Sequence, residues 1–205
     1  MTLSPAAFDD LPAEPYDKVR PRIRTGDLLL FAGRDLSSRA IAWGTHSPFS
    51  HVALVVRVPF VDRIMLLQAV ATGVGAVAMS SLAAGSGPHQ RPFDGRMVLA
   101  RHADFAALAT REGLRSMSRF ALRRFGAPYD MAEILRIMLR IALGWGGLRL
   151  PRPIRPRDEY ICSEYVYECL RRVGVTLTWD GLGFIAPADI ASDPKVEPVA
   201  VIHTA

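Results

Sequence analysis

Runs of apolar residues predict several strands in the first half of the chain. Leu28–Phe31 is a short apolar run typical of a buried strand. His51–Val58 is rich in β-branched residues and is followed by a proline, which makes it the strongest strand signal in the sequence. Ile64–Val70 follows after a turn around Asp62-Arg63, so we expect the two runs to pair as an antiparallel hairpin. Shorter strands are predicted at residues 73–77, 97–101 and 199–202.

Apolar residues three and four positions apart predict helices, most of them in the second half of the chain. Residues 104–125 and 131–143 show this spacing among arginines. In Tyr160–Gly174 an apolar residue recurs at every fourth position, and the final glycine is suited to end a helix. A shorter helix is predicted over residues 34–43, with four apolar side chains facing inward: Leu36, Ala40, Ile41 and Trp43.

The domain organisation predicted from the sequence is simple. Residues 1–20 contain Pro5, Pro12 and Pro15 and show no clear period, so we expect an extended arm over residues 1–22. Residues 23–205 carry no internal repeat and are enough for one domain with a sizeable core.

Charge and hydropathy narrow the range of partners. The net charge is +5, and the arginines behind it are spread along the chain without interleaved aromatics, so we expect no nucleic-acid partner. Charged residues interrupt the apolar segment 131–150, so no membrane span is expected there, although a basic amphipathic helix leaves peripheral membrane contact open. The chain start lacks the features of a signal peptide, which favours a cytoplasmic location. The oligomeric state is left open.

Cys162 is the candidate nucleophile. It lies in the first turn of the predicted helix, where the helix dipole and unpaired N–H groups favour the thiolate. Cys169 lies seven residues further along the same helix, about 10 Å away and beyond disulfide reach, so it is expected to fill the core. No Cys or His spacing typical of a zinc site occurs, and we expect neither a metal nor another cofactor.

His51 and Gln68 are the candidate partners of this thiol. His51 begins the strongest strand after a polar loop, where its ring would lie at a sheet edge and serve as a base. The competing interpretations are a structural histidine bonded to a neighbouring carbonyl, or His46 in the same role. Gln68 is a polar residue within an apolar strand, and it either accepts from the imidazole N–H or faces solvent.

A series of short motifs then gives a resemblance to a known family. The motifs occur in the order Gly26–Phe31, Thr45–Val55, Leu67–Ala69, Gly126–Asp130, Tyr160–Glu164 and Ala186–Asp189. The series resembles the circularly permuted NlpC/P60 papain-like enzymes of the YiiX/YaeF type, over roughly residues 24–195. It implies an α+β fold in which an antiparallel sheet packs against helices and the cysteine begins one of them.

The resemblance also implies site residues. It assigns Cys162 as nucleophile and His51 as base, and it places Gln68 where the family usually has a glutamate. The Cys162 backbone N–H is the expected first donor to an oxyanion. Tyr160, Ser163 and Tyr129 are expected to complete the oxyanion hole or shape the cleft.

The function expected from these residues is that of a cysteine hydrolase of the amidase, peptidase or esterase kind. It would attack an amide or ester carbonyl through an acyl-enzyme, with a small acyl-amide, peptide or lipid as substrate. Two alternatives remain open. One is a catalytically inactive binding module that keeps the papain-like cleft. The other is a thiol acyltransferase similar to the lecithin–retinol acyltransferase relatives.

Overall fold

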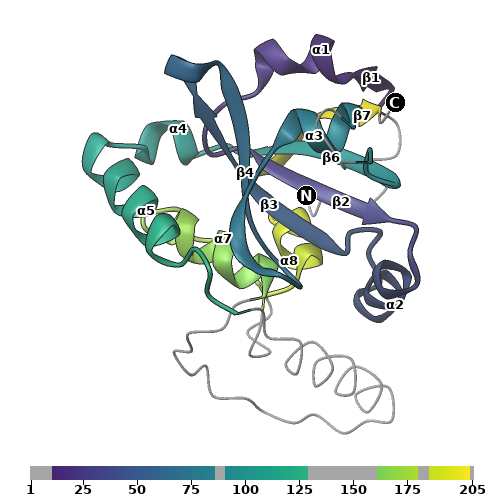
Figure 1. The fold of residues 1–205 in the computed structure, drawn as a ribbon. Helices are drawn as coiled ribbons and strands as arrows, with labels where there is room; N and C mark the ends of the chain where they lie inside the picture. Colours follow the sequence, from purple (N-terminus) through teal and green to yellow (C-terminus); the bar gives the residue numbers. More distant parts are fainter. Residues whose placement is uncertain (1–10, 86–90, 129–160, 180–184, 204–205) are drawn as a thin grey trace, which may run out of the picture.

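A seven-stranded sheet organises the fold (Figure 1). In a computed structural model of the chain we describe residues 11–85, 91–128, 161–179 and 185–203. The strand order is β1-β7-β6-β2-β3-β4-β5. The strands are β1 (Ala13–Pro15), β2 (Leu28–Gly33), β3 (His51–Val58), β4 (Arg63–Val70), β5 (Gly73–Ala78), β6 (Gly95–His102) and β7 (Val196–His203). The predicted β3–β4 hairpin is confirmed.

Helices lie on both faces of this sheet and at its ends (Figure 1). The α-helices are α1 (Tyr16–Val19), α2 (Leu36–Thr45), α3 (Met79–Ala84), α4 (Phe105–Leu108), α5 (Arg111–Arg123), α7 (Cys162–Arg171) and α8 (Pro187–Ser192). Short 3-10 turns occupy Arg20–Arg22 and Pro59–Val61. The architecture is therefore α+β, as predicted.

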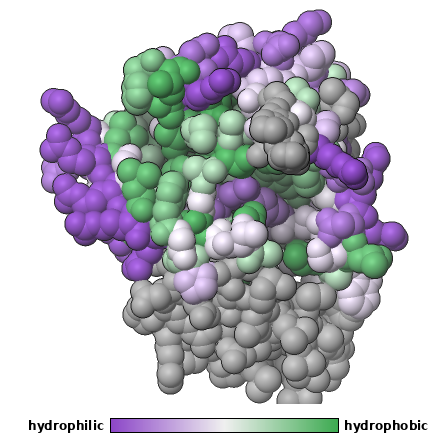
Figure 2. All heavy atoms as spheres, in the orientation of Figure 1, coloured by the Kyte–Doolittle hydropathy of each residue, from purple (hydrophilic) through white to green (hydrophobic). Residues whose placement is uncertain are grey.

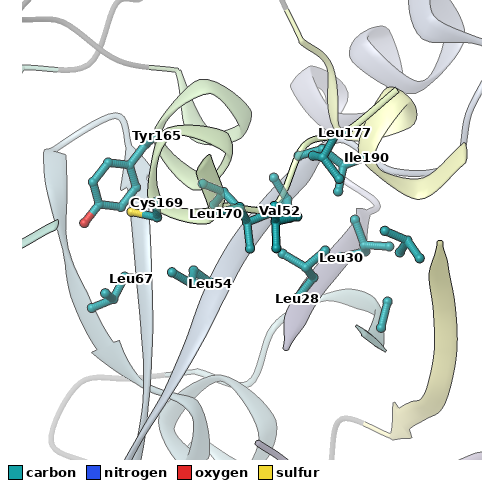
Figure 3. Packing of buried hydrophobic residues seen from close by; sticks show 14 of the residues in the cluster. Leu28, Leu30, Val52, Leu54, Leu67, Tyr165, Cys169, Leu170, Leu177 and Ile190 are labelled. Carbon is teal, nitrogen blue, oxygen red and sulfur yellow. The ribbon is translucent and has the colours of Figure 1, made fainter. Parts of the chain in front are cut away.

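Residues that alternate along the central strands fill two separate cores. In β3, Val52 and Leu54 face the core shared with α5, α7 and α8, while Ala53 and Val55 face the core shared with α1 and α3. Figure 3 shows Val52 and Leu54 beside Leu170 of α7 in the first core. Burial on both faces explains why β3 reads as a continuous apolar run rather than an alternating one.

The sheet is mixed, which corrects the prediction of an antiparallel sheet. β1 pairs parallel with β7, whereas the other described pairings are antiparallel. The predicted extended arm is also only partly correct. Residues 13–15 are extended as β1, but residues 16–22 are helical, and Val19 is fully buried in the second core. Apolar burial therefore joins the described part of the arm to the domain.

Helix α2 contradicts its predicted orientation. None of its residues is buried, and the side chains of Leu36 and Trp43 are 83% and 65% exposed. Asp35 caps the helix by accepting the Ser38 N–H, and α2 lies beyond the end of β2 rather than over a face of the sheet (Figure 1). Within the described ranges no apolar layer covers α2 at that corner, so the inward orientation predicted for its side chains is wrong.

The predicted helix over residues 104–125 is divided in two. The first part, α4, ends at Leu108. Thr110 then caps α5, because its side-chain oxygen accepts the Gly113 N–H at 3.0 Å. The prediction for residues 131–143 lies outside the described residues. Among the described residues, no helix is both long enough and apolar enough to cross a bilayer.

Candidate active site at the start of helix α7

Two elements meet where the predicted site residues lie. Helix α7 packs across β3 and β4, and its first residue is Cys162. Strand β3 begins at His51. Because Val52, the next residue of β3, shares a core with α7, the start of the helix is held against the start of the strand. The prediction that Cys162 occupies the first turn of a helix is confirmed.

His51 and Gln68 are neighbours through the sheet register. Leu54 pairs with Leu67, and both face the first core, so Gln68 and His51 face the opposite side by alternation. His51 Nε2 lies 2.9 Å from Gln68 Oε1. An amide oxygen only accepts, so Nε2 carries the proton and Nδ1 is left for the sulfur of Cys162. Of the two interpretations of Gln68, the structure supports the hydrogen bond to the imidazole.

The thiol and the imidazole change each other's protonation. Burial opposes the thiolate of Cys162, which is 5% exposed, but the charge and hydrogen bond of His51, together with two backbone N–H groups, lower the pKa of the thiol below its ordinary value. Burial likewise opposes protonation of His51, yet Cys162 and then Gln68 bring its pKa above the ordinary value. Opposite shifts of this kind favour a thiolate–imidazolium pair near neutral pH.

Two backbone N–H groups also stabilise the sulfur. The N–H of Val52 and the N–H of Ser163 both donate to Cys162 and lower the pKa of its thiol. One comes from the start of β3 and the other from the first turn of α7. The Ser163 N–H belongs to the first-turn N–H groups that were predicted to favour the thiolate. The Val52 N–H was not predicted, because a backbone group of another element carries no residue-type signal.

The imidazole ring of His51 packs against Phe31, which in turn packs against a second aromatic ring. Phe31 of β2 pairs with His51 in the sheet, and the two ring centroids are 5.1 Å apart. The Phe93 ring packs edge-on against the Phe31 ring, and their centroids are 5.0 Å apart. Gly95 makes room for this arrangement, since a Cβ there would lie 2.7 Å from the Phe93 ring. Packing against Phe31 thus restricts the ring of His51, in addition to the hydrogen bond that the ring donates to Gln68.

Ser163 has a different place from the one predicted for it. Its side chain is fully buried, and its hydroxyl donates to the Ile185 carbonyl at 2.6 Å. The hydroxyl therefore does not line a cleft, and the prediction of a cleft role for this side chain is corrected. Asp189 fixes the same segment from the other side by accepting the Ala186 N–H at 2.7 Å. Together these bonds tie the start of α7 to the start of α8.

The remaining candidates fall into three groups. Tyr129 and Tyr160 lie outside the described residues, so their predicted roles stay predictions. His46, the alternative base, is the exposed αL residue that ends α2, whereas His51 makes the contact with Cys162. Cys169 is fully buried, and burial raises the pKa of its thiol to about 12, in agreement with the core role predicted for it.

The described part of the chain shows no metal-binding cluster. No group of three or more His, Cys, Asp or Glu side chains within residues 11–85, 91–128, 161–179 and 185–203 is arranged to hold a metal ion. Cys162 and His51 supply two donors, and the third neighbour, Gln68, supplies a neutral amide oxygen. The donor set described here does not fit a metal centre.

Comparisons with known proteins relate the chain to solved structures by fold. No protein-family model and no curated protein matches the sequence. The crystal structure of metalloprotein YiiX from Escherichia coli O157:H7, described as DUF1105, matches with a TM-score of 0.58. The match covers 86% of this chain and 96% of that one, at 18% sequence identity. The chain therefore has a YiiX-type fold.

Proposed function

We propose that this chain is a cysteine hydrolase with a permuted papain-like active site, in which Cys162 is the nucleophile and His51 the general base. The observation that carries the proposal is the line from the Cys162 sulfur through His51 to Gln68, with 2.9 Å between His51 Nε2 and Gln68 Oε1. A thiol beside an imidazole that a third polar group orients is the arrangement of thiol hydrolases. The order of the motifs along the chain, with His51 before Cys162, supports the permuted form.

The first half of the reaction forms an acyl-enzyme. The Cys162 thiolate attacks the carbonyl carbon of an amide or ester, and the carbonyl π electrons move onto the oxygen. The backbone N–H of Cys162, at the start of α7, has no acceptor within the helix and is suited to donate to that oxyanion. When the tetrahedral species collapses, the bond to the leaving group breaks. The leaving amine or alcohol takes the proton from His51 Nδ1.

The second half regenerates the thiolate. His51, now neutral, removes a proton from water, and the resulting hydroxide attacks the thioester carbon. Collapse expels the Cys162 thiolate and releases the acid, while the imidazolium is restored. Gln68 keeps the Nε2–H in place through both halves, but it adds no negative charge to stabilise the imidazolium. We therefore expect a weaker ion pair than a glutamate at this position would give.

The substrate class proposed is a small acyl-amide, a peptide or a lipid acyl ester. Intact-mass measurement after incubation with a panel of peptide, N-acyl and ester probes tests this directly. A mass increase equal to the acyl group, on wild-type protein and absent from Cys162→Ala, would identify the nucleophile and the substrate class. Adducts of equal yield on both proteins would contradict the assignment of Cys162.

Further measurements with the same probes separate hydrolysis from the two alternatives. An acyltransferase would form the same adduct but pass the acyl group to an added amine or alcohol faster than to water. A binding module would retain probes without any adduct, and Cys162→Ala would bind them as well as the wild type does. The pKa shifts of Cys162 and His51 favour a reactive thiolate, which supports an enzyme over a binding module.

A further inference from the structure

Helix α5 presents a basic face that the proposed chemistry does not use. Arg111, Arg115, Arg119 and Arg123 follow one another at intervals of four residues, and all of them are exposed. Four residues make about one helical turn, so their side chains share one face over roughly 18 Å. The opposite face is apolar and packs into the first core through Met117, Phe120 and Ala121. In Figure 2 the outer side of α5 is a hydrophilic band at the left of the view.

These four arginines have no acidic partner among the residues that the structure describes. None of the four forms an ion pair with any residue of the described ranges. Six arginines elsewhere pair with carboxylates: Arg20 with Asp62, Arg22 with Glu14, Arg34 with Asp94, Arg101 with Asp27, and Arg171 and Arg172 with Glu168. Arg24, Arg39 and Arg63 are also exposed and form no ion pair with a described residue, but they belong to separate segments, whereas the four arginines of α5 share one helix face.

Such a face weakens the helix that carries it. Like charges four residues apart repel one another, and Glu112 is the single acidic residue between Arg111 and Arg123. If this face were only exposed to water, alternating positive and negative side chains would keep it equally soluble, and they would attract one another and stabilise the helix. The repeated arginine is therefore best accounted for by an external anion that lies along the helix.

The neighbouring apolar residues indicate what kind of anion this is. Leu122 is 60% exposed although it lies between Arg119 and Arg123, and Phe125, just beyond α5, is 40% exposed. A membrane surface accommodates both kinds of side chain, since phosphates bind the guanidinium groups and the acyl boundary takes up the apolar ones. Nucleic acid would use the arginines but give an exposed leucine little to bind.

We propose that the outer face of α5, formed by Arg111, Arg115, Arg119, Leu122 and Arg123, docks the protein on a membrane surface rich in anionic phospholipid. The helix lies parallel to the surface, and its apolar face stays in the core. Each arginine near such a surface strengthens partitioning by roughly fivefold. The surface acts independently of Cys162, so this interaction stands or falls separately from the proposed hydrolase function.

Vesicle co-sedimentation of the full chain tests the proposal. The probes are vesicles of phosphatidylcholine alone and of phosphatidylcholine with about one third phosphatidylglycerol, an anionic fraction large enough to give the surface potential on which such docking depends. Wild-type protein and Cys162→Ala are expected to bind the anionic vesicles alike and to be released by high salt. Arg115→Glu combined with Arg119→Glu is expected to weaken partitioning by at least about tenfold.

The matched control carries the same change of net charge elsewhere. Arg34→Glu combined with Arg39→Glu reverses two exposed arginines beside and within α2, and it is expected to bind within about twofold of wild type because its charges lie off the proposed surface. Equal loss in the two double variants would overturn the proposal in favour of net charge alone. Absence of binding to anionic vesicles, or tighter binding to a DNA or RNA oligonucleotide at the same salt, would also overturn it. Thermal unfolding of each variant confirms that the comparison is between folded proteins.

Discussion

At the scale of single residues, Gln68 decides how strongly the imidazolium is held. It accepts the Nε2–H of His51 at 2.9 Å, so it selects the tautomer that leaves Nδ1 for Cys162. Gln68 carries no charge, so it raises the pKa of His51 through its hydrogen bond alone, whereas Cys162 raises it through both its charge and its hydrogen bond. The hydrogen bond that orients the imidazole and a negative charge beside it can therefore be changed separately at residue 68, with one substitution for each.

Gln68→Ala removes the orienting bond, while Gln68→Glu keeps an acceptor and adds a negative charge. We expect Gln68→Ala to lower kcat/KM by about tenfold to hundredfold, the range for losing a hydrogen bond to a charged group. Gln68→Glu should raise the pKa of His51 further, because an opposite charge favours the imidazolium. The pH dependence of kcat/KM and of Cys162 alkylation measures both. An unchanged rate in Gln68→Ala would show that Gln68 does not orient the base.

Ser163 contacts Cys162 through its backbone and not through its hydroxyl. Its hydroxyl holds the Ile185 carbonyl, and its N–H donates to the Cys162 sulfur. Ser163→Ala leaves a buried carbonyl without its donor, which costs about 1–3 kcal/mol of stability. It should also shift the pH profile of Cys162 alkylation upward. Ser163→Thr keeps a hydroxyl and should restore much of the profile.

Tyr165→Phe is the control for this effect. Tyr165 lies on the same helix, and its buried hydroxyl donates to the Ala121 carbonyl at 3.2 Å. Its loss is expected to lower stability by about 1 kcal/mol while leaving Cys162 alkylation unchanged. If Tyr165→Phe slows alkylation as much as Ser163→Ala does, the effect of Ser163 is general loosening of α7 and not positioning.

At the scale of elements, a buried histidine joins the end of β6 to the start of β7. His102 is 1% exposed, and its Nδ1 accepts the Asp104 N–H at 3.2 Å. Its Nε2 lies 4.0 Å from Asp193 Oδ1 and has no hydrogen-bond partner among the described residues. Asp193 instead accepts backbone N–H groups from Thr178 and Lys195. The junction is thus built around a neutral imidazole.

This junction predicts a loss of stability in weak acid. Burial lowers the pKa of His102 in the folded state, against opposing contributions from Asp193 and Asp104, so the unfolded chain binds the proton more readily. The stability contributed by the neutral ring is present above about pH 6.5 and declines as the pH falls below it. Chemical denaturation of wild type and His102→Gln between pH 5 and 8 should show curves that converge toward acid pH. Parallel curves would contradict this assignment.

At the scale of the whole molecule, local sequence signals predicted the centre of the fold better than its borders. The strands β2, β3 and β4 and the first turn of α7 are confirmed, because each is specified by its own apolar pattern and packs within the central layers. The His51–Gln68 contact is confirmed for the same reason, since it follows from the register of one hairpin.

Features that depend on distant parts of the chain were not predictable in this way. The parallel pairing of β1 with β7 joins the two ends of the described chain, and no local pattern encodes it. The outward face of α2 depends on what surrounds that helix. The partner of Ser163, Ile185, lies 22 positions further along the chain and reaches it only through packing. Spacing along the sequence carries none of this information.

The central claim is that Cys162 is a thiolate held by His51, and alkylation by iodoacetamide tests it most directly. Mass spectrometry of Cys162, with buried Cys169 as internal reference, gives the rate of labelling as a function of pH. We predict rapid labelling of Cys162 below pH 7, which His51→Ala abolishes, since the lowered pKa of the thiol depends on the imidazole. Labelling that rises only with the pKa of a free thiol, about 8.5, and does so equally in both proteins, would contradict the account.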